Sequence, residues 1–172
     1  MTSTRTALIT GASHGLGRAL AGALAERGWR LLLTARTPTD LEAAASDLAG
    51  AAEVVARAGD VSDANHREEL ARVVGGWGHL DLLVNNASTL GPTPLRPLPD
   101  LTAEDLAQIL SVNVVAAHAL TRAMLPALER AEGTLLDISS DAAVEHYETW
   151  GGYGASKAAL DQIGRASCRE RV

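Results

Sequence analysis

Short apolar runs alternate along the chain with longer segments in which apolar residues recur at helical spacing. The apolar runs are rich in aliphatic residues, and they predict five strands, over residues 5–10, 30–36, 52–58, 80–87 and 133–140. The longer segments carry capping residues or end on glycine, and they predict helices over residues 17–28, 37–50, 63–78 and 102–130. A further helix begins in the stretch "YGASKAALDQ", residues 153–162.

This alternation of strand and helix predicts the fold class. Parallel strands need a crossover segment that is usually a helix, so the pattern predicts an α/β fold with a doubly wound parallel sheet. Several strands are continuous apolar runs, as expected where helices cover both faces of a sheet. No internal repeat or linker divides residues 1–162, which we expect to form one domain.

The last ten residues, "IGRASCRERV" (163–172), differ in character from the rest of the chain. They contain the only cysteine, Cys168, and they are what one reading frame of a standard short-read sequencing adapter encodes. We therefore expect the natural sequence to end near Gln162 and residues 163–172 to be a non-native tail, which is set aside in fold reasoning. The alternative is a natural, divergent C-terminus.

Composition narrows the classes of function. Of the 172 residues, 47% are hydrophobic, which argues against disorder, and the formal charge of −6 argues against a nucleic-acid-binding surface. The N-terminal stretch "MTSTRTALITGAS" is too short in its apolar part for a signal peptide or a membrane span, so we expect a cytoplasmic protein with no membrane partner. A single cysteine excludes an internal disulfide, and no spacing of cysteine and histidine predicts a metal site.

The stretch "TGASHGLG" (10–17) joins the first predicted strand to the first helix. Its glycines, Gly11, Gly15 and Gly17, suit a tight turn that a phosphate group can approach closely. The helix behind it offers free backbone N–H groups and a positive dipole end, which favour a pyrophosphate. The stretch therefore predicts a dinucleotide-binding loop, with a glycine-rich turn that binds nothing as the alternative.

Lys157 is the only lysine in a chain with fourteen arginines. Arginine cannot be deprotonated and carries a broad planar head, so a single retained lysine suggests a role that needs a compact ammonium. Tyr153 lies four residues earlier, on the same face of the predicted helix. A nearby ammonium favours the phenolate and lowers the pKa of tyrosine towards values useful for proton transfer. Alone, such a pair can also be an ordinary solvated pair on a helix.

Together these motifs resemble the classical short-chain dehydrogenase/reductase family, whose glycine loop has the spacing TGxxxGxG. Its other motifs follow in order over residues 5–162: "GDV" after the third strand, "NNAS" at the end of the fourth, and a Ser…Tyr-x-x-x-Lys set. Ser88 stands where the family usually has glycine. The resemblance implies a Rossmann fold, and because such folds have about six strands, a chain with five is expected to be incomplete at its C-terminus.

The resemblance also implies roles for individual residues. Tyr153 would give a proton to a carbonyl oxygen or take one from an alcohol, while Lys157 binds the nicotinamide ribose and tunes Tyr153. Ser140 would hydrogen-bond the reacting oxygen, although it could instead cap the loop after its strand. Asn113 would hold a water that links Lys157 to solvent, although it could instead mark an irregularity in its helix. The residues expected to bind the cofactor are Gly11, Ser13, His14, Gly15, Leu16, Gly17, Arg36, Asp60, Val61, Asn86, Ala87, Tyr153 and Lys157.

Arg36 bears on the choice of cofactor. Proteins that bind NAD usually place an acidic residue at the end of the second strand, where it holds the ribose 2′-OH. Here the strand ends in Ala35 and Arg36, and an arginine can pair with a 2′-phosphate. His14 in the glycine loop could add a second contact. We therefore expect NADP(H) to be preferred over NAD(H), with an arginine that only faces solvent as the alternative.

The sequence thus predicts an oxidoreductase that transfers a hydride between NADP(H) and a small carbonyl or alcohol substrate. A cofactor-binding regulatory protein and an inactive fragment of the same fold are the alternatives, and a sugar-nucleotide epimerase is disfavoured because its loop usually reads TGxxGxxG. Residues 141–152 are expected to border the substrate, with Tyr147 and Trp150 either forming an apolar wall or packing on the sheet. We expect the full-length protein to form a homo-oligomer, a dimer or tetramer, and the 172-residue chain alone to be inactive.

Overall fold

The structure is a computed structural model that describes residues 4–169. The chain forms two compact units. We call residues 1–87 and 119–136 the sheet unit and residues 88–118 and 137–172 the helical unit, and we describe each by itself.

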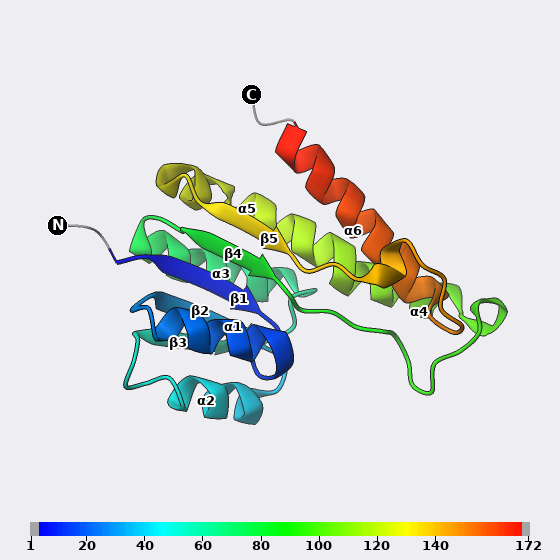
Figure 1. Ribbon diagram of the computed structural model, residues 1–172, viewed down its shortest axis with the longest axis horizontal. Coiled ribbons are helices and arrows are strands. Elements are labelled where there is room, and N and C mark those ends of the chain that lie inside the picture. The colour runs from blue at the N-terminus through cyan, green and yellow to red at the C-terminus, as the bar shows by residue number, and fades with distance from the viewer. Residues whose placement is uncertain (1–3, 170–172) are drawn as a thin grey trace. The chain divides into compact units, whose positions relative to one another are not determined.

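The sheet unit is built on one sheet of five strands. Their bounds are β1 Thr6–Thr10, β2 Arg30–Ala35, β3 Val54–Ala58, β4 Leu82–Asn85 and β5 Thr134–Asp137. The strand order is β3-β2-β1-β4-β5, and β1 pairs in parallel with both β2 and β4 (Figure 1). The order reverses after β3, which confirms the predicted doubly wound α/β fold.

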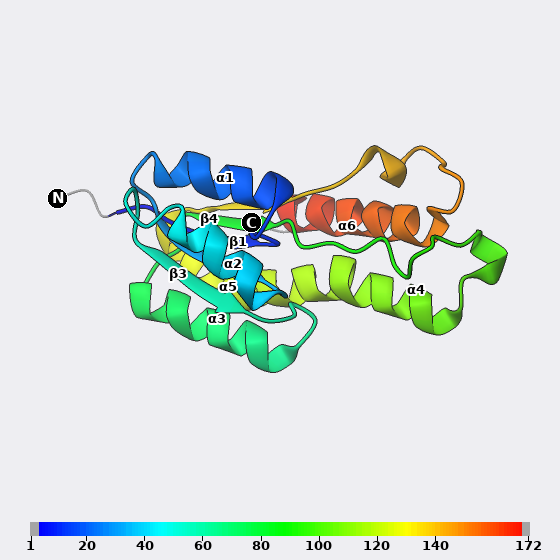
Figure 2. The same ribbon diagram turned by 90° about the horizontal axis from the view of Figure 1, so that it is seen from below.

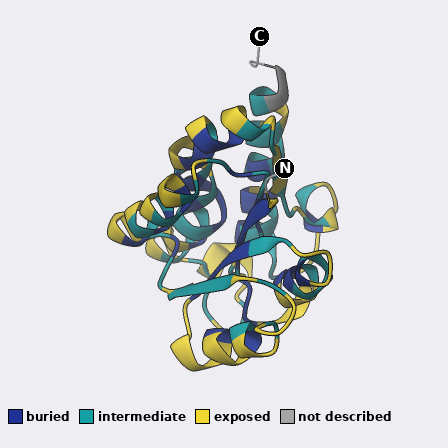
Figure 3. Ribbon diagram, turned by 90° about the vertical axis from the view of Figure 1, so that its left-hand side faces the viewer, coloured by how far each residue is buried: buried dark blue, intermediate teal, exposed yellow. Residues whose placement is uncertain are grey.

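The two central strands explain why the chain folds around this sheet. Every residue of β1 is buried, and so is β2 from Leu31 to Ala35 (Figure 3). Leu8 lies opposite Leu32 in the β1–β2 register, and neither side chain is exposed. Because successive side chains of a strand point to opposite faces, a strand that is apolar throughout must be covered on both faces.

Four helices are associated with this sheet: α1 (Gly15–Ala25), α2 (Pro38–Ser46), α3 (Ala64–Trp77) and, from Ala119 onward, α5 (Ala117–Ala131). Helix α1 lies on one face of the sheet, and α3 and α5 lie on the other (Figure 2). Apolar side chains from β1, β2, α3, β4 and α5 form one buried cluster on the second face, which includes Leu8, Leu32, Leu70, Leu83, Leu120 and Met124.

The helical unit contains helices α4 (Ala103–Leu110) and α6 (Gly151–Arg169), a π-helical segment η2 (Ser111–Ala116), and the short 3-10 helices η1 (Leu98–Asp100) and η3 (Asp141–Ala143). Thr102 caps α4, because its hydroxyl accepts a hydrogen bond from the Asp105 N–H at 3.1 Å. The helix predicted over 102–130 is present as a helical run over Ala103–Ala131, with a π-helical segment between α4 and α5. Such segments are often found at functional sites.

Helix α6 packs against α4 through a glycine. A Cβ atom at Gly152 would come within 2.7 Å of the Leu101 side chain, just before α4, and within 3.1 Å of Ile109 in α4, so the close approach requires glycine there. Helix α6 continues through Gln162, the predicted end of the natural sequence, to Arg169. The assignment of residues 163–172 as a non-native tail stays a prediction, and residues 170–172 lie outside the described residues.

The helical run Ala103–Ala131 is long and apolar enough to cross a membrane by length and composition alone. The core helix of a soluble protein passes the same test. In the sheet unit, Leu120, Met124 and Leu128 from this run are buried in the cluster against the sheet. This packing is that of a core helix.

Candidate functional site

The glycine loop between β1 and α1 has a backbone that only glycine suits at several points. Gly11 and Gly15 have φ angles of +63° and +56°, in the left-handed region that favours glycine. A Cβ atom at Gly17 would overlap with the carbonyl oxygen of Gly11. The backbone of the loop therefore packs directly against the first turn of α1, with no side chain between Gly11 and Gly17.

The start of α1 has the properties of an anion site. His14 is its N-cap residue but makes no side-chain hydrogen bond to the first turn, and its ring instead contacts the Ser13 hydroxyl at 2.8 Å. The first N–H groups of α1 thus lack a side-chain cap, and the helix dipole favours negative charge there. Leu16 in this turn is 51% exposed. The loop fits a pyrophosphate group by its backbone and its charge.

Thr10 and Asn86 join this loop to the end of β4. The Thr10 hydroxyl accepts hydrogen bonds from the N–H groups of Asn86 and Ala87, both at 2.9 Å. The Asn86 side chain donates to the carbonyl oxygens of Thr10 and Gly11, at 2.9 and 3.1 Å. The structure therefore brings the predicted Gly11, Gly17, Asn86 and Ala87 together. Thr10 was missing from the predicted set, although it opens the motif "TGASHGLG".

Arg36 and Asp60 follow the neighbouring strands β2 and β3. Arg36 is exposed, and Val61 after Asp60 is buried. Burial raises the pKa of the Asp60 carboxyl, but hydrogen bonds from Ser62 and the positive charge of Arg36 outweigh burial and lower it below its usual value. Asp60 is thus ionised at neutral pH, and its carboxylate is fixed by the Ser62 N–H and hydroxyl at 2.8 and 2.7 Å.

In the helical unit, Tyr153 and Lys157 lie on one face of α6 as predicted. The Lys157 ammonium lies 5.6 Å from the centroid of the Tyr153 ring and donates a hydrogen bond to the Ile138 carbonyl at 2.7 Å. Lys157 is only 2% exposed. This burial excludes the alternative of a solvated pair on the surface of a helix, because a charged side chain is rarely buried without a specific role.

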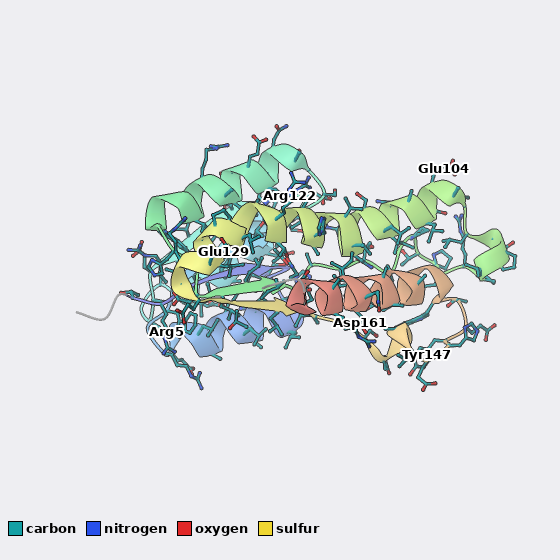
Figure 4. All side chains as sticks on the ribbon, turned by 90° about the horizontal axis from the view of Figure 1, so that it is seen from above. Arg5, Glu104, Arg122, Glu129, Tyr147 and Asp161 are labelled. Atoms are coloured by element: carbon teal, nitrogen blue, oxygen red, sulfur yellow. The ribbon has the colours of Figure 1, made fainter. Side chains whose placement is uncertain are left out.

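The environment of Lys157 alters its protonation. Burial lowers the pKa of the Lys157 ammonium below its usual value, and the negative charges of Asp161 and Asp137 oppose this shift only in part. Asp161 lies on α6, one turn beyond Lys157 (Figure 4). A lysine with a lowered pKa gives up a proton more readily than one in water, which suits a group that takes part in proton transfer.

Asn113 lies in the π-helical segment η2 and is buried. Its side chain accepts a hydrogen bond from the Thr89 N–H at 2.8 Å and donates to the Thr89 carbonyl and the Ser156 hydroxyl, both at 2.9 Å. Asn113 therefore joins the segment after β4 to α6, the helix that carries Tyr153. The sequence prediction did not include Thr89 and Ser156. Asn113 does lie at an irregularity of its helix, as the alternative interpretation of this residue expected.

Ser140 lies at the start of η3. Its hydroxyl accepts a hydrogen bond from the Ala142 N–H at 3.2 Å and donates to the Asp141 carboxylate at 3.0 Å. Ser140 therefore caps a short helix, which is the alternative role given to it in the sequence analysis. Its hydroxyl is hydrogen-bonded to Asp141 and not to Tyr153. A serine hydroxyl can also accept or donate further hydrogen bonds, so this position leaves its predicted role open to a test.

Tyr147 and Trp150 line a cavity of about 280 Å³ between η3 and α6, together with residues 142–146, Gly151, Gly154, Ala155 and Ala158. The Trp150 ring contacts Tyr147 on one side and Tyr153 on the other, with centroid distances of 5.7 and 5.4 Å. The Tyr147 hydroxyl donates to Asp141 at 2.8 Å, and this bond raises the pKa of Tyr147. Tyr147 projects from the segment before α6 (Figure 4) and is poorly suited to donate a proton near neutral pH.

Comparison with known proteins extends these observations. The family described as short chain dehydrogenase matches residues 5–171. A serine 3-dehydrogenase of Agrobacterium fabrum is 36% identical over 161 residues, which are 92% of this chain and 62% of that protein. An NADPH-dependent pterin aldehyde reductase of Arabidopsis thaliana is 34% identical over 170 residues, which are 98% of this chain and 69% of that protein.

A solved structure shows the same architecture. The alcohol dehydrogenase from the archaeon Thermococcus sibiricus, complexed with 5-hydroxy-NADP, has a TM-score of 0.90 and 34% identity, and the match covers 98% of this chain and 72% of that one. The chain spans about three fifths of the length of the curated relatives it matches. From the glycine loop, the Tyr153–Lys157 pair and a family match over nearly the whole chain, we conclude that this protein belongs to the short chain dehydrogenase family.

Proposed function

We propose that the protein is an NADP(H)-dependent oxidoreductase that interconverts a small carbonyl compound and the corresponding alcohol. The observation that carries this proposal is the buried Lys157 ammonium, 5.6 Å from the centre of the Tyr153 ring. A positive charge next to a phenol stabilises the phenolate, and this allows the tyrosine to give up or accept a proton near neutral pH. Membership of the short chain dehydrogenase family supports the same reaction class.

In the proposed reaction, Tyr153 gives its proton to the carbonyl oxygen of the substrate, or takes the proton from an alcohol in the reverse direction. When bound, the nicotinamide supplies or accepts the hydride. Lys157 stabilises the phenolate left on Tyr153 and holds the nicotinamide ribose. Ser140 hydrogen-bonds the reacting oxygen, and Asn113 holds a water through which a proton reaches Lys157. These are the roles proposed for the four residues.

The cofactor proposal rests on features of the sheet unit. The open N-terminus of α1 and the glycine loop suit a pyrophosphate, and the exposed Arg36 suits a 2′-phosphate. We propose that Ser13, Gly15, Leu16, Asp60 and Val61 complete the cofactor site with the residues named above. A relative that is described as NADPH-dependent and a solved relative in complex with an NADP derivative support a preference for NADP(H) over NAD(H).

The proposal extends to the setting of the protein. The net charge of −6 and the fold of a soluble enzyme support a cytoplasmic protein that acts on small molecules and not on nucleic acid or membranes. We propose that the full-length protein works as a homo-oligomer, and a measurement of its mass in solution by light scattering tests this part separately.

Replacement of Tyr153 tests the proposal most directly. In the full-length gene product, Tyr153→Phe should keep its affinity for NADPH and lose about 10²–10⁴-fold in kcat for carbonyl reduction, because only the proton donor is removed. The matched control is Tyr147→Phe, which removes the other tyrosine hydroxyl of the chain and should keep most of the turnover. Retained kcat in Tyr153→Phe would contradict the proposal. The same assay on the 172-residue chain tests the expectation that this chain alone is inactive.

A further inference from the structure

His66 is a buried histidine in the first turns of α3, and none of the proposed roles uses it. Only 6% of the residue is exposed, whereas an unpaired imidazole would normally face solvent. From the sequence alone, such a histidine is most simply interpreted as a surface or otherwise satisfied residue. In the structure it lies behind the carboxyl ends of β2 and β3, the two strands that lead to Arg36 and Asp60.

The first contact of His66 is with β2. Its Nε2 atom lies 2.7 Å from the hydroxyl of Thr34, which is fully buried and two residues before Arg36. The carbonyl oxygen of the same Thr34 accepts a hydrogen bond from the Ala12 N–H of the glycine loop at 3.1 Å. The side chain and the backbone of Thr34 thus connect His66 with both β2 and the glycine loop, the proposed pyrophosphate site.

The second contact of His66 is with the turn after β3. A Cβ atom at Gly59 would overlap with the His66 ring, so the imidazole packs directly on the backbone of the residue before Asp60. The Gly59 N–H also donates to the Ala35 carbonyl at 3.0 Å, which holds the ends of β2 and β3 together. Next to His66 on α3, Arg67 donates to the Val61 carbonyl at 2.7 Å. Helix α3 therefore fixes the turn that carries Asp60 and Val61.

We propose that His66 is a positioning residue for the adenosine end of NADP(H): it fixes the ends of β2 and β3 so that Arg36 and Asp60 meet the 2′-phosphate and the adenine. This inference rests on the proposed cofactor. His66 reaches the cofactor only through Thr34 and Gly59, and its imidazole fills the space that the missing side chain of Gly59 leaves.

The charge state of His66 is part of this arrangement. Burial lowers the pKa of its imidazole below the usual value, and the charges of Glu69, Asp63 and Asp60 oppose this shift only in part, while Arg67 adds to it. Arg57 of β3, which also faces α3, is paired with Glu69 at 2.9 Å. Thr34, the group that faces the ring from β2, has no charge. His66 is therefore neutral at pH 7.5, and its protonation in acid places a charge between two packed strand ends.

The experiment measures dissociation constants of NADPH and NADH by fluorescence titration of the full-length protein, called the unmodified chain below, and its variants. Thr34→Val and His66→Leu should bind NADPH about fivefold to tenfold more weakly at pH 7.5, because each removes one buried hydrogen bond behind Arg36. The loss for NADH should be smaller, since NADH lacks the 2′-phosphate. His66→Gln keeps a neutral hydrogen-bonding group near Thr34 and should restore NADPH affinity to within about twofold.

The pH dependence of NADPH affinity distinguishes two roles of His66: positioning the strand ends as a neutral imidazole, and filling space in the core. As the pH falls from 7.5 through the lowered pKa of His66, the unmodified chain should lose more NADPH affinity than His66→Gln, whose side chain does not titrate. The 2′-phosphate titrates in a similar range, but it is common to both proteins and cancels in the comparison. His79→Gln is the matched control, because His79 lies at the opposite end of the sheet, 3.2 Å from the Thr4 carbonyl, and should bind NADPH like the unmodified chain.

Two results would overturn the inference and leave the proposed cofactor intact: equal NADPH affinity in the unmodified chain and His66→Leu, or identical pH profiles of the unmodified chain and His66→Gln. Failure of the full-length, unmodified protein to bind NADPH would overturn the proposed function itself. Thermal unfolding of each variant is followed first. If His66→Leu does not fold, the comparison of pH profiles alone decides, because the polar substitution His66→Gln keeps the hydrogen bond.

Discussion

The Lys157 ammonium lies 5.6 Å from the centre of the Tyr153 ring, one turn away on α6, and is 2% exposed. Among the described residues, the one hydrogen bond that this ammonium donates goes to the Ile138 carbonyl at 2.7 Å. A buried cation with one carbonyl partner is costly to maintain in the folded state. This unfavourable burial occurs at the one lysine of the sequence, which shares a helix face with Tyr153.

Lys157→Met should therefore separate the catalytic and the structural effects of this charge. We expect the full-length variant to lose about 10²–10⁴-fold in kcat, since Tyr153 no longer has a neighbouring charge that stabilises its phenolate. The apolar methionine side chain fits the buried position without a charge. The variant should fold, and urea unfolding of variant and parent measures this.

The same pair of proteins tests the pKa of Lys157. Because burial lowers this pKa in the folded state below 10.5, the unfolded chain binds more protons than the folded one between the lowered value and 10.5. Stability contributed by Lys157 is thus present above 10.5 and is lost as the pH falls through the lowered pKa. The free energy of unfolding of the parent minus that of Lys157→Met should rise from pH 7 to pH 10. A constant difference would show that the pKa of Lys157 is not lowered.

The glycine loop gives a prediction with a close control on the same helix. Gly17→Ala should destabilise the protein by about 1–3 kcal/mol and abolish NADPH binding, because the new Cβ overlaps with the Gly11 carbonyl and forces the loop apart. Gly22→Ala, also in α1, adds a Cβ into open space and should stabilise the helix by about 0.5–1 kcal/mol. Thermal unfolding with and without NADPH measures both effects. A Gly17→Ala variant with parental affinity would mean that the loop does not need this close approach.

The fold was predictable because its signal is periodic. Continuous apolar runs such as that of β1 identify buried strands, and each helix between them shows its own spacing and stop signals. The ends of the strands were less predictable. The run over 80–87 contains only Leu82–Asn85 as a strand, because Asn86 and Ala87 leave the sheet to bond with the Thr10 hydroxyl. Such bonds depend on a residue more than seventy positions away, which no local pattern reveals.

The candidate site was predictable in its residue types and less so in its contacts. The pairing of Tyr153 with Lys157 follows from helical spacing alone. The partners of Asn113 do not, because Thr89 and Ser156 lie 24 and 43 residues away in the chain. His66 was equally hidden, since only the folded chain brings Thr34 and Gly59 to its ring. Long-range side-chain contacts of this kind depend on the tertiary structure.

The contacts of Asn113 predict a structural role that stability measurements can detect. Asn113→Ala leaves the Thr89 N–H and carbonyl and the Ser156 hydroxyl without this partner, and should cost about 2–4 kcal/mol of unfolding free energy. Ser156→Ala removes one of these bonds and should cost about 1 kcal/mol. Urea denaturation of both variants gives the comparison. If Asn113→Ala were as stable as the parent, the role of Asn113 would lie in catalysis alone.

The proposed preference for NADP(H) over NAD(H) depends on Arg36. It is exposed at the end of β2, and its charge lowers the pKa of the neighbouring Asp60. Arg36→Asp should weaken NADPH binding by about tenfold to a hundredfold, because it removes a charge-assisted contact and adds a repulsive carboxylate. NADH binding should change little or improve, since a carboxylate at this place can accept a hydrogen bond from the ribose 2′-OH.

The control for Arg36→Asp is Arg72→Asp, which makes the same charge change at an exposed position on α3. It should alter the dissociation constants of both cofactors by less than about twofold, because Arg72 is not among the residues of the proposed cofactor site and salt screens exposed charges. Titration of both variants with NADPH and NADH at fixed ionic strength gives four dissociation constants. If Arg36→Asp weakens the two cofactors equally, Arg36 does not read the 2′-phosphate, and the preference for NADP(H) must come from another residue or be absent.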